Sequence, residues 1–121
     1  MQSGDLIAVN GNLYEYGEIE KAEYSKGTFH KVYVVDIDKE GILTSTGITS
    51  YLTDGELSNR GIHLTEEQWL GLVRHFLRQD YDLTEEEIED AAEDIVCRCF
   101  ATTRIPLVEE LPNYIAIYMN R

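Results

Sequence analysis

The chain has 121 residues, 43% of them hydrophobic, and its 23 acidic residues against 10 basic ones give a formal net charge of −13. This length and apolar content predict one globular domain, residues 1–121, rather than a disordered acidic tail. The excess of acid argues against direct binding to duplex DNA, because nucleic-acid affinity depends on Lys and Arg that neutralise phosphates.

The first residues, Met1 to Gly11, lack the positive segment and the long apolar run of a secretory signal. No apolar run approaches the roughly 18 residues of a membrane span. The two cysteines, Cys97 and Cys99, are too few for a secreted disulfide framework and fit a reducing compartment. We therefore expect a cytoplasmic protein that does not bind a membrane.

Residues 5–64 are predicted to be β-rich, because short β-favouring runs alternate there with turn signals. Asn10-Gly11 is the strongest of these signals, since a type I′ turn requires positive φ at both central residues. Leu6–Ala8 should therefore pair with Leu13–Tyr16. The run His30–Asp38 is partly apolar on both faces, which is typical of a central strand. A mainly antiparallel sheet from Leu6 to Leu64 follows.

Two helices are predicted in residues 65–101, and they begin with nearly the same sequence, LTEEQW from Leu64 and LTEEEI from Leu83. Each start matches a capping box, with Thr65 paired to Gln68 and Thr84 to Glu87, and a hydrophobic staple around it. The short linker Arg78–Asp82 makes the two helices an α-hairpin. The apolar stripes expected to be buried are Trp69, Leu72, Val73 and Phe76, then Ile88, Ala91, Ala92, Ile95, Val96 and Cys99.

A last strand is predicted in residues 105–119. Pro106 and Pro112 flank a bend, and Tyr114, Ala116 and Tyr118 then alternate with other apolar residues up to Met119. Tyr33, Tyr114 and Tyr118 are accordingly interpreted as sheet residues. The predicted fold class is α+β: a mainly antiparallel sheet, an α-hairpin packed on it and a returning C-terminal strand.

Nine acidic residues and no basic one lie between Asp80 and Asp94. At 100° per residue the helix directs Glu86, Glu89, Asp90 and Glu93 outward, with Glu87 and Asp94 on a flank. The helix dipole and the cap account for the first-turn acids, but not for Glu89 onward. A solvated helix face, a bound cation and a partner-binding face are the alternatives. The predicted partner-binding residues are Asp80, Tyr81, Asp82, Glu86, Glu89, Asp90, Glu93 and Asp94.

Other candidate sites are weaker. Asp36–Gly41 copies the opening of a calcium loop, but Gly47 stands where the bidentate acid belongs, and a β-turn explains the same residues. The three histidines, His30, His63 and His75, show no metalloprotease spacing, and no nucleophile elbow or phosphate loop occurs. We therefore expect a protein that is not an enzyme and that binds no metal and no cofactor. Cys97 faces outward, and Tyr81 is the preferred aromatic anchor for a partner.

The segment ITSYLTDGELSNRGIHLTEEQWLGL, Ile48 to Leu72, resembles the last strands and the helix start of the positive cofactor four family of single-strand DNA-binding coactivators. That resemblance implies a single-strand nucleic-acid-binding module. Ser58-Asn59-Arg60, with one positive charge, stands where the family has basic residues. The matching residues are Tyr51, Asp54-Gly55-Glu56, Gly61-Ile62-His63-Leu64 and Glu67-Gln68-Trp69.

In small size, acidity and lack of motifs the chain also resembles phage inhibitors of host defence nucleases, including anti-CRISPR and DNA-mimic proteins. Such a protein would act in the host-cell cytoplasm. Our leading hypothesis is a non-enzymatic acidic protein that docks on a basic, nucleic-acid-binding protein or nuclease and blocks it. The alternatives are the single-strand nucleic-acid binder and a homo-oligomeric structural protein, such as a homodimer.

Overall fold

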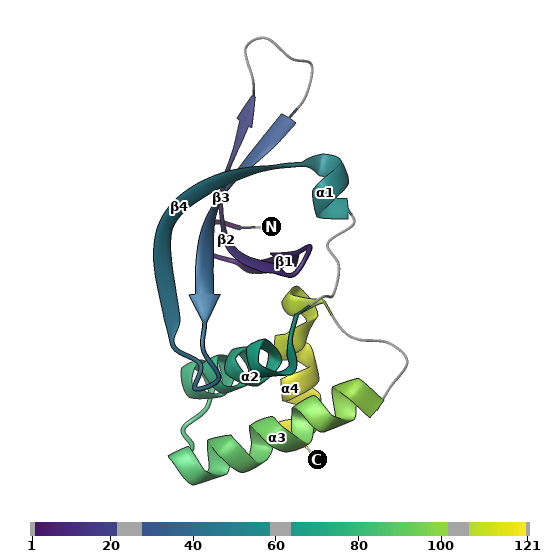
Figure 1. The fold of residues 1–121 in the computed structure, drawn as a ribbon. Helices are drawn as coiled ribbons and strands as arrows, with labels where there is room; N and C mark the ends of the chain where they lie inside the picture. Colours follow the sequence, from purple (N-terminus) through teal and green to yellow (C-terminus); the bar gives the residue numbers. More distant parts are fainter. Residues whose placement is uncertain (1, 22–27, 59–63, 102–106, 121) are drawn as a thin grey trace.

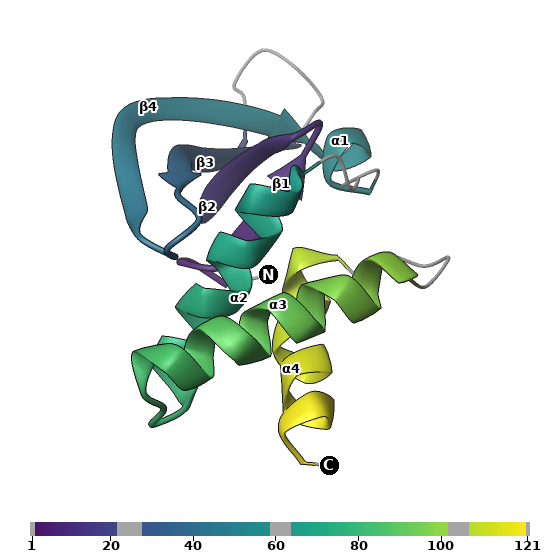
Figure 2. The same ribbon diagram turned by 60° about the horizontal axis from the view of Figure 1, so that its bottom comes forward.

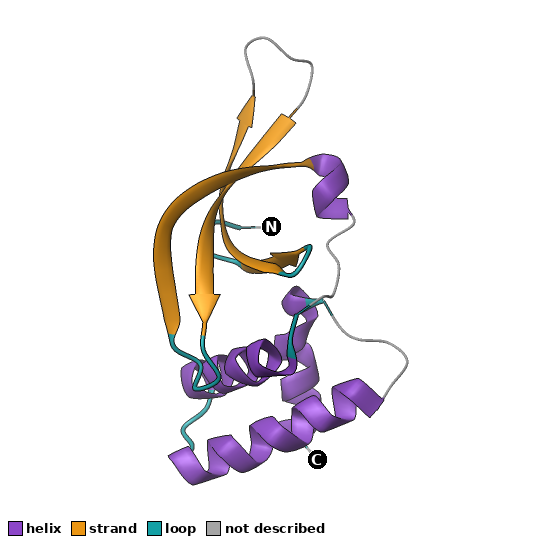
Figure 3. Ribbon diagram, in the orientation of Figure 1, coloured by secondary structure: helices purple, strands orange, loops and turns teal. Residues whose placement is uncertain are grey.

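The computed structural model describes residues 2–21, 28–58, 64–101 and 107–120 (Figure 1). Within these ranges the chain combines one antiparallel sheet with a layer of helices (Figure 3), which confirms the α+β class. The strands, in sheet order, are β1 (Leu6–Val9), β2 (Asn12–Lys21), β3 (Thr28–Ile37) and β4 (Leu43–Thr53). The helices are α1 (Asp54–Ser58), α2 (Glu66–Asp80), α3 (Glu85–Ala101), the short 3-10 helix η1 (Val108–Glu110) and α4 (Leu111–Met119).

The β1–β2 hairpin forms as the sequence predicts. Ile7 pairs with Tyr14 and Ala8 with Leu13. The turn between them has φ of 52° at Asn10 and 81° at Gly11, both in the left-handed region that a type I′ turn needs. The predicted central strand is also confirmed, because β3 pairs with β2 on one side and β4 on the other.

The sheet is strongly curled, and Figure 2 shows β4 bending around the other strands with α1 at the open end of the curl. One face of the sheet packs on the helical layer, and the other faces the inside of the curl. Successive residues of a strand therefore belong to different apolar clusters. The larger cluster joins Ala8, Leu13, Val35 and Ile37 to α2, α3 and α4. The smaller cluster is Ile7, Val9, Tyr14, Tyr16, Val32, Leu52 and Leu57.

Helix α2 lies between the sheet and α3 (Figure 1). Gly71 of α2 lies against the β3–β4 turn, where an added Cβ would lie 2.1 Å from the Asp38 backbone oxygen. Arg74 and Arg78 of α2 donate hydrogen bonds to the carbonyls of Lys39 and Glu40 in the same β3–β4 turn. The helix and the turn are thus joined by backbone contact and by two guanidinium groups.

Both predicted capping boxes are confirmed. The backbone N–H of Gln68 donates to Thr65 Oγ1 at 3.2 Å, and that of Glu87 donates to Thr84 Oγ1 at the same distance. The α-hairpin is confirmed as well. Most of the predicted stripe residues are buried, although Phe76 and Ala91 are only partly covered. The side chain of Cys99 lies outside the described part of the structure. Leu77 and Arg74 are buried beyond the predicted set.

The predicted C-terminal strand is wrong, because residues 111–119 form helix α4. Its buried residues, Leu111 and Ile115, are four positions apart, which is a helical spacing, and Pro112 occupies the first turn, where proline fits. Apolar residues fill both alternating sets of this segment, so a period of two does not distinguish a strand from a helix. Tyr114 and Tyr118 are therefore helix residues, not sheet residues.

The predicted sheet also extends too far, since β4 ends at Thr53 and α1 follows at once. The Glu56 backbone N–H donates to Thr53 Oγ1 at 3.2 Å, and the Thr53 N–H donates to Glu56 Oε1 at 3.1 Å. This is the reciprocal pattern of a third capping box. The sequence Thr53-Asp54-Gly55-Glu56 therefore starts a helix within the range that had been predicted as sheet.

Candidate functional site

The acidic face of α3 consists of Glu86, Glu89, Asp90 and Glu93, all exposed. It lies on the other side of the helix from the buried stripe of Ile88, Ala92, Ile95 and Val96. None of its four carboxylates forms a hydrogen bond or ion pair with another residue in the described ranges. The geometry predicted from the sequence is therefore present.

The first-turn acids beside this face are used by the fold. Glu85 forms an ion pair with Arg78 of α2, in which Glu85 Oε2 lies 3.0 Å from Arg78 Nη2. The backbone N–H of Thr84, and then its hydroxyl, hold the pKa of Glu87 below its usual range. Asp94, on the same flank as Glu87, has its Oδ2 3.3 Å from Arg98 Nε. Charges that serve folding thus border a set that has no such role in the described residues.

The residues at the edge of the predicted surface, Asp80, Tyr81 and Asp82, also differ in whether the fold uses them. Asp80, the last residue of α2, and Asp82, in the connection to α3, are both exposed. Tyr81 is half-buried instead, because its side chain packs against the larger cluster and its backbone N–H caps α2 through the Leu77 carbonyl at 3.0 Å. The structure therefore gives Tyr81 a packing role, whereas Asp80 and Asp82 extend the acidic surface.

A groove runs along the border between α3 and α4 and encloses about 490 Å³. We call it the α3–α4 groove. One wall carries the carboxylates of α3, and the other residues are apolar or aromatic. The lining residues are Leu83, Glu87, Asp90, Ala91, Asp94, Tyr118 and Met119. The sequence did not indicate this groove, because residues 111–119 were assigned to a strand that would rejoin the sheet.

Arg98 lies at this border and is held by both helices. Its Nε approaches Asp94 Oδ2 at 3.3 Å, and its guanidinium carbon lies 5.4 Å from the ring centroid of Tyr118 on α4. Both distances fall within the range of a favourable interaction. A carboxylate of α3 and an aromatic ring of α4 thus hold one guanidinium group together.

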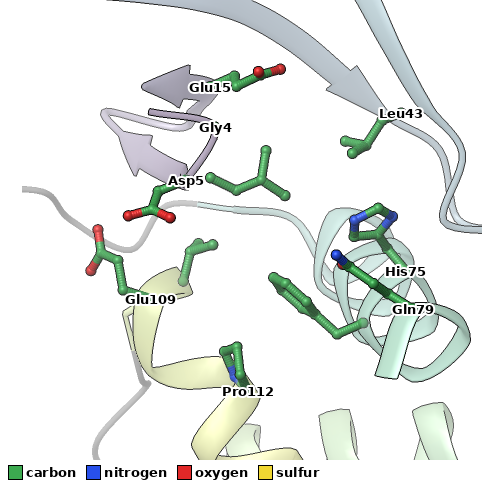
Figure 4. A pocket seen from close by; sticks show the side chains of 11 residues that line it. Gly4, Asp5, Glu15, Leu43, His75, Gln79, Glu109 and Pro112 are labelled. Carbon is green, nitrogen blue, oxygen red and sulfur yellow. The ribbon is translucent and has the colours of Figure 1, made fainter. Parts of the chain in front are cut away.

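A pocket of about 390 Å³ lies between the β1–β2 hairpin, α2 and η1 (Figure 4). Asp5 and Glu109 lie on one side of it, and His75 and Gln79 lie on the other. Burial is the largest influence on His75 and lowers the pKa of its imidazole, which favours the neutral ring. Asp5 is occupied locally, since it accepts the Gln2 backbone N–H at 2.8 Å. The pocket could accept a small polar molecule, but no residue pattern in the sequence pointed to it.

A second arrangement absent from the sequence prediction links Tyr16, His30 and Asp54. His30 is buried, with Nδ1 2.8 Å from the Tyr16 hydroxyl and Nε2 2.5 Å from Asp54 Oδ1. Because Asp54 begins α1, this chain of hydrogen bonds fastens α1 to β2 and β3. Its residues are 14 and 24 positions apart, so no local motif could have revealed it.

The calcium-like residues Asp36–Gly41 form the end of β3 and the turn that follows it. Asp38 Oδ1 accepts the backbone N–H groups of Glu40 at 2.9 Å and Ile42 at 3.1 Å. The same carbonyl-rich turn is covered by Arg74 and Arg78, whose positive charges oppose a bound cation. Cys97 is exposed with a free thiol, as the helical spacing predicts.

The segment that resembles the coactivator family is only partly comparable. Tyr51 lies on β4, and Glu67-Gln68-Trp69 begins α2, as expected, but Asp54-Gly55-Glu56 belongs to a helix. Residues 61–63 lie outside the described ranges. Comparisons with protein-family models, curated proteins and solved structures found no match to this chain. None of the helices in the described ranges has the length and apolar character required to cross a membrane.

Proposed function

We propose that this chain is a non-enzymatic binding protein whose acidic α3 face docks on a basic, nucleic-acid-binding protein surface and blocks it. A phage inhibitor of a host defence nuclease would be one protein of this type. The observation that carries the proposal is the set of four exposed carboxylates on α3, Glu86, Glu89, Asp90 and Glu93, which have no partner among the described residues.

The face has the geometry of a regular row of negative charges. Glu86, the pair Glu89 and Asp90, and Glu93 follow one another at steps of about 5 Å along the helix axis. A nucleic-acid strand also presents regularly spaced negative charges, and proteins bind it in grooves lined by Lys and Arg. A capped helix packed on α2 keeps this row rigid, which reduces the ordering cost of binding.

The acids have a cost that folding does not explain. Glu86 and Asp90, Glu89 and Glu93, and Asp90 and Asp94 are like-charged pairs four residues apart, and each such pair destabilises a helix by a few tenths of a kcal/mol. Beyond the first turn these residues gain nothing from the helix dipole. A partner that supplies positive charge would remove this repulsion.

The proposal is tested with the purified chain as bait in a host-cell extract, beside the triple variant Glu89→Gln, Asp90→Asn, Glu93→Gln. Nucleic-acid-binding proteins should be captured by the natural chain, lost from the variant, released by added DNA and weakened by salt. Equal capture by the variant, or captured proteins that DNA does not displace, would refute the proposal. A matched control, Glu18→Gln with Glu20→Gln on β2, changes charge on the sheet and should leave capture unchanged.

The single-strand nucleic-acid binder is the second candidate, favoured by the exposed rings of Tyr33 and Tyr51 on the uncovered part of the sheet. Lys31 pairs in register with Tyr51 and lies beside Tyr33, so the three form one patch. Glu15 and Glu18 lie across the ladder from Tyr33 and Lys31, however, and their charges oppose phosphate. Retention of single-stranded oligonucleotides at low salt, lost on Tyr51→Ala, would establish this function instead.

A further inference from the structure

We propose that the α3–α4 groove binds an arginine-bearing amphipathic segment of a protein partner, with the arginine on Asp90, beside the chain's own Arg98 and next to the Tyr118 ring. The inference rests on the proposed function and specifies its partner. The partner's apolar side chains would pack on Leu83, Ala91 and Met119 of the groove floor.

The two helices that form the groove differ in chemistry. The α3 wall presents Glu87, Asp90 and Asp94. The α4 segment, LPNYIAIYM, carries no charged residue, and Ile117 on it is 64% exposed. A segment that fits both walls must therefore be positively charged on one side and apolar on the other. A free nucleic acid is excluded as occupant by the acid, and a purely polar basic loop would leave the apolar wall uncovered.

The chain's own Arg98 shows which basic residue suits this border. Its guanidinium is held both by Asp94 and by the face of Tyr118. Arginine suits this combination better than lysine, because a planar, weakly hydrated guanidinium stacks on a ring and still donates hydrogen bonds to carboxylate. Asp90 lies one helical turn before Asp94 and has no partner among the described residues, so a second guanidinium can bind beside the first.

The test uses three synthetic helical peptides of equal length and measures their binding by fluorescence anisotropy. The first has arginines on one face and leucines on the other, the second replaces every arginine by lysine, and the third replaces the leucines by serine. The natural chain should bind the arginine peptide about three- to five-fold more tightly than the lysine peptide. It should bind the serine peptide more weakly than either.

Variants of the chain then locate the site. Tyr118→Leu should abolish the preference for arginine over lysine, and Tyr118→Phe, which keeps the ring, should retain it. Arg98→Gln should tighten binding of the arginine peptide more than Lys31→Gln does, because both remove one positive charge but only Arg98 occupies the groove border. Melting curves of each variant confirm that it folds.

Equal binding of the arginine and lysine peptides, or an arginine preference that survives Tyr118→Leu, would overturn the inference. The triple variant Glu89→Gln, Asp90→Asn, Glu93→Gln separates this result from a failure of the proposed function. If that variant loses all three peptides while the natural chain binds them without preference, the acidic face stands and the groove inference fails. If it binds all three peptides as the natural chain does, the acidic face itself is refuted.

Discussion

Helices α2 and α3 begin with almost the same capped sequence, yet they use their charged residues in opposite ways. On α2, Arg74 is buried and bonds to Lys39, while Arg78 bonds to Glu40 and to Glu85 of α3. On α3, the acidic residues from Glu86 to Glu93 point outward, and most have no partner in the described structure.

The difference shows which charges the fold requires. The charged groups of α2 close a contact between a helix and a turn, so their removal should cost stability. Those of α3 repel one another and stand outside the packing, so their removal should not. The contrast can be tested through the free energy of unfolding of single variants, measured by denaturant titration unless another measurement is given.

Gly71→Ala should have the largest effect, a loss of about 3 kcal/mol, because an added methyl group overlaps a backbone atom and forces α2 away from the turn. The added Cβ would lie 2.1 Å from the Asp38 oxygen. Gly55→Ala on α1 is the matched control, since its Cβ would meet only Thr53 Oγ1, at 3.8 Å. Equal stability of the two variants would show that α2 is not held against the turn.

Arg74→Gln should cost about 2 kcal/mol, because Arg74 is buried and its charged hydrogen bond to the Lys39 carbonyl is lost. The same substitution on α3, Arg98→Gln, removes an exposed ion pair four residues apart and should cost less than about 0.5 kcal/mol. A similar loss at both positions would contradict the contrast between the helices.

Thr65→Ala and Thr84→Ala should each cost about 1 kcal/mol, because each removes the side-chain acceptor of a capping box. Circular dichroism should show shortened helices rather than an unfolded chain. Thr65→Ser and Thr84→Ser keep the hydroxyl and serve as controls. The two losses in the free energy of unfolding show whether the capping box stabilises the two helices equally. If Thr84→Ala has no effect, other contacts determine where α3 begins.

The triple variant Glu89→Gln, Asp90→Asn, Glu93→Gln should gain stability, by a few tenths of a kcal/mol for each repulsive pair that it removes. The gain should shrink in high salt, which screens the repulsion in the natural chain. A loss of stability would show that these acids contribute to the fold, and it would weaken the proposed partner-binding role.

His75 should give the smallest effect, visible as a pH dependence. Burial lowers its folded-state pKa below the usual 6.5, so the unfolded chain takes up a proton at a higher pH than the folded one. Its contribution to stability is therefore complete above pH 6.5 and is lost as the pH falls through the folded pKa. Compared with His75→Gln, the natural chain should lose more stability between pH 7 and pH 5; equal slopes would contradict the shift.

The sequence predicted correctly those elements that are specified by residues close together in the chain. Asn10-Gly11 specifies its turn through backbone conformation, and the two capping boxes specify helix starts through adjacent hydrogen bonds. Thr53 and Glu56 also have the spacing of a capping box, so the same pattern predicts the start of α1. The C-terminal segment could not be assigned from its pattern, because Tyr114 to Met119 is apolar at nearly every position and fits a period of two as well as 3.6.

The candidate site follows the same division. The outward direction of Glu89, Asp90 and Glu93 could be predicted, since it depends only on helical geometry and on a nearby buried stripe. The α3–α4 groove could not, because it depends on where α4 packs. A partner-binding role for Tyr81 was predicted because tyrosine is favoured at interfaces. Only the tertiary structure shows that its side chain packs against the larger cluster.

The two apolar clusters lie on opposite faces of one sheet, and no described side chain belongs to both. Ile7 and Ala8 are neighbours in β1, yet Ile7 packs in the smaller cluster and Ala8 in the larger one. The sheet therefore separates the two clusters, so that side chains of one do not pack against side chains of the other. Substitutions on the helical layer can accumulate on one side of the sheet without changing the packing inside the curl, so the acidic face can evolve faster than the cluster on the other side.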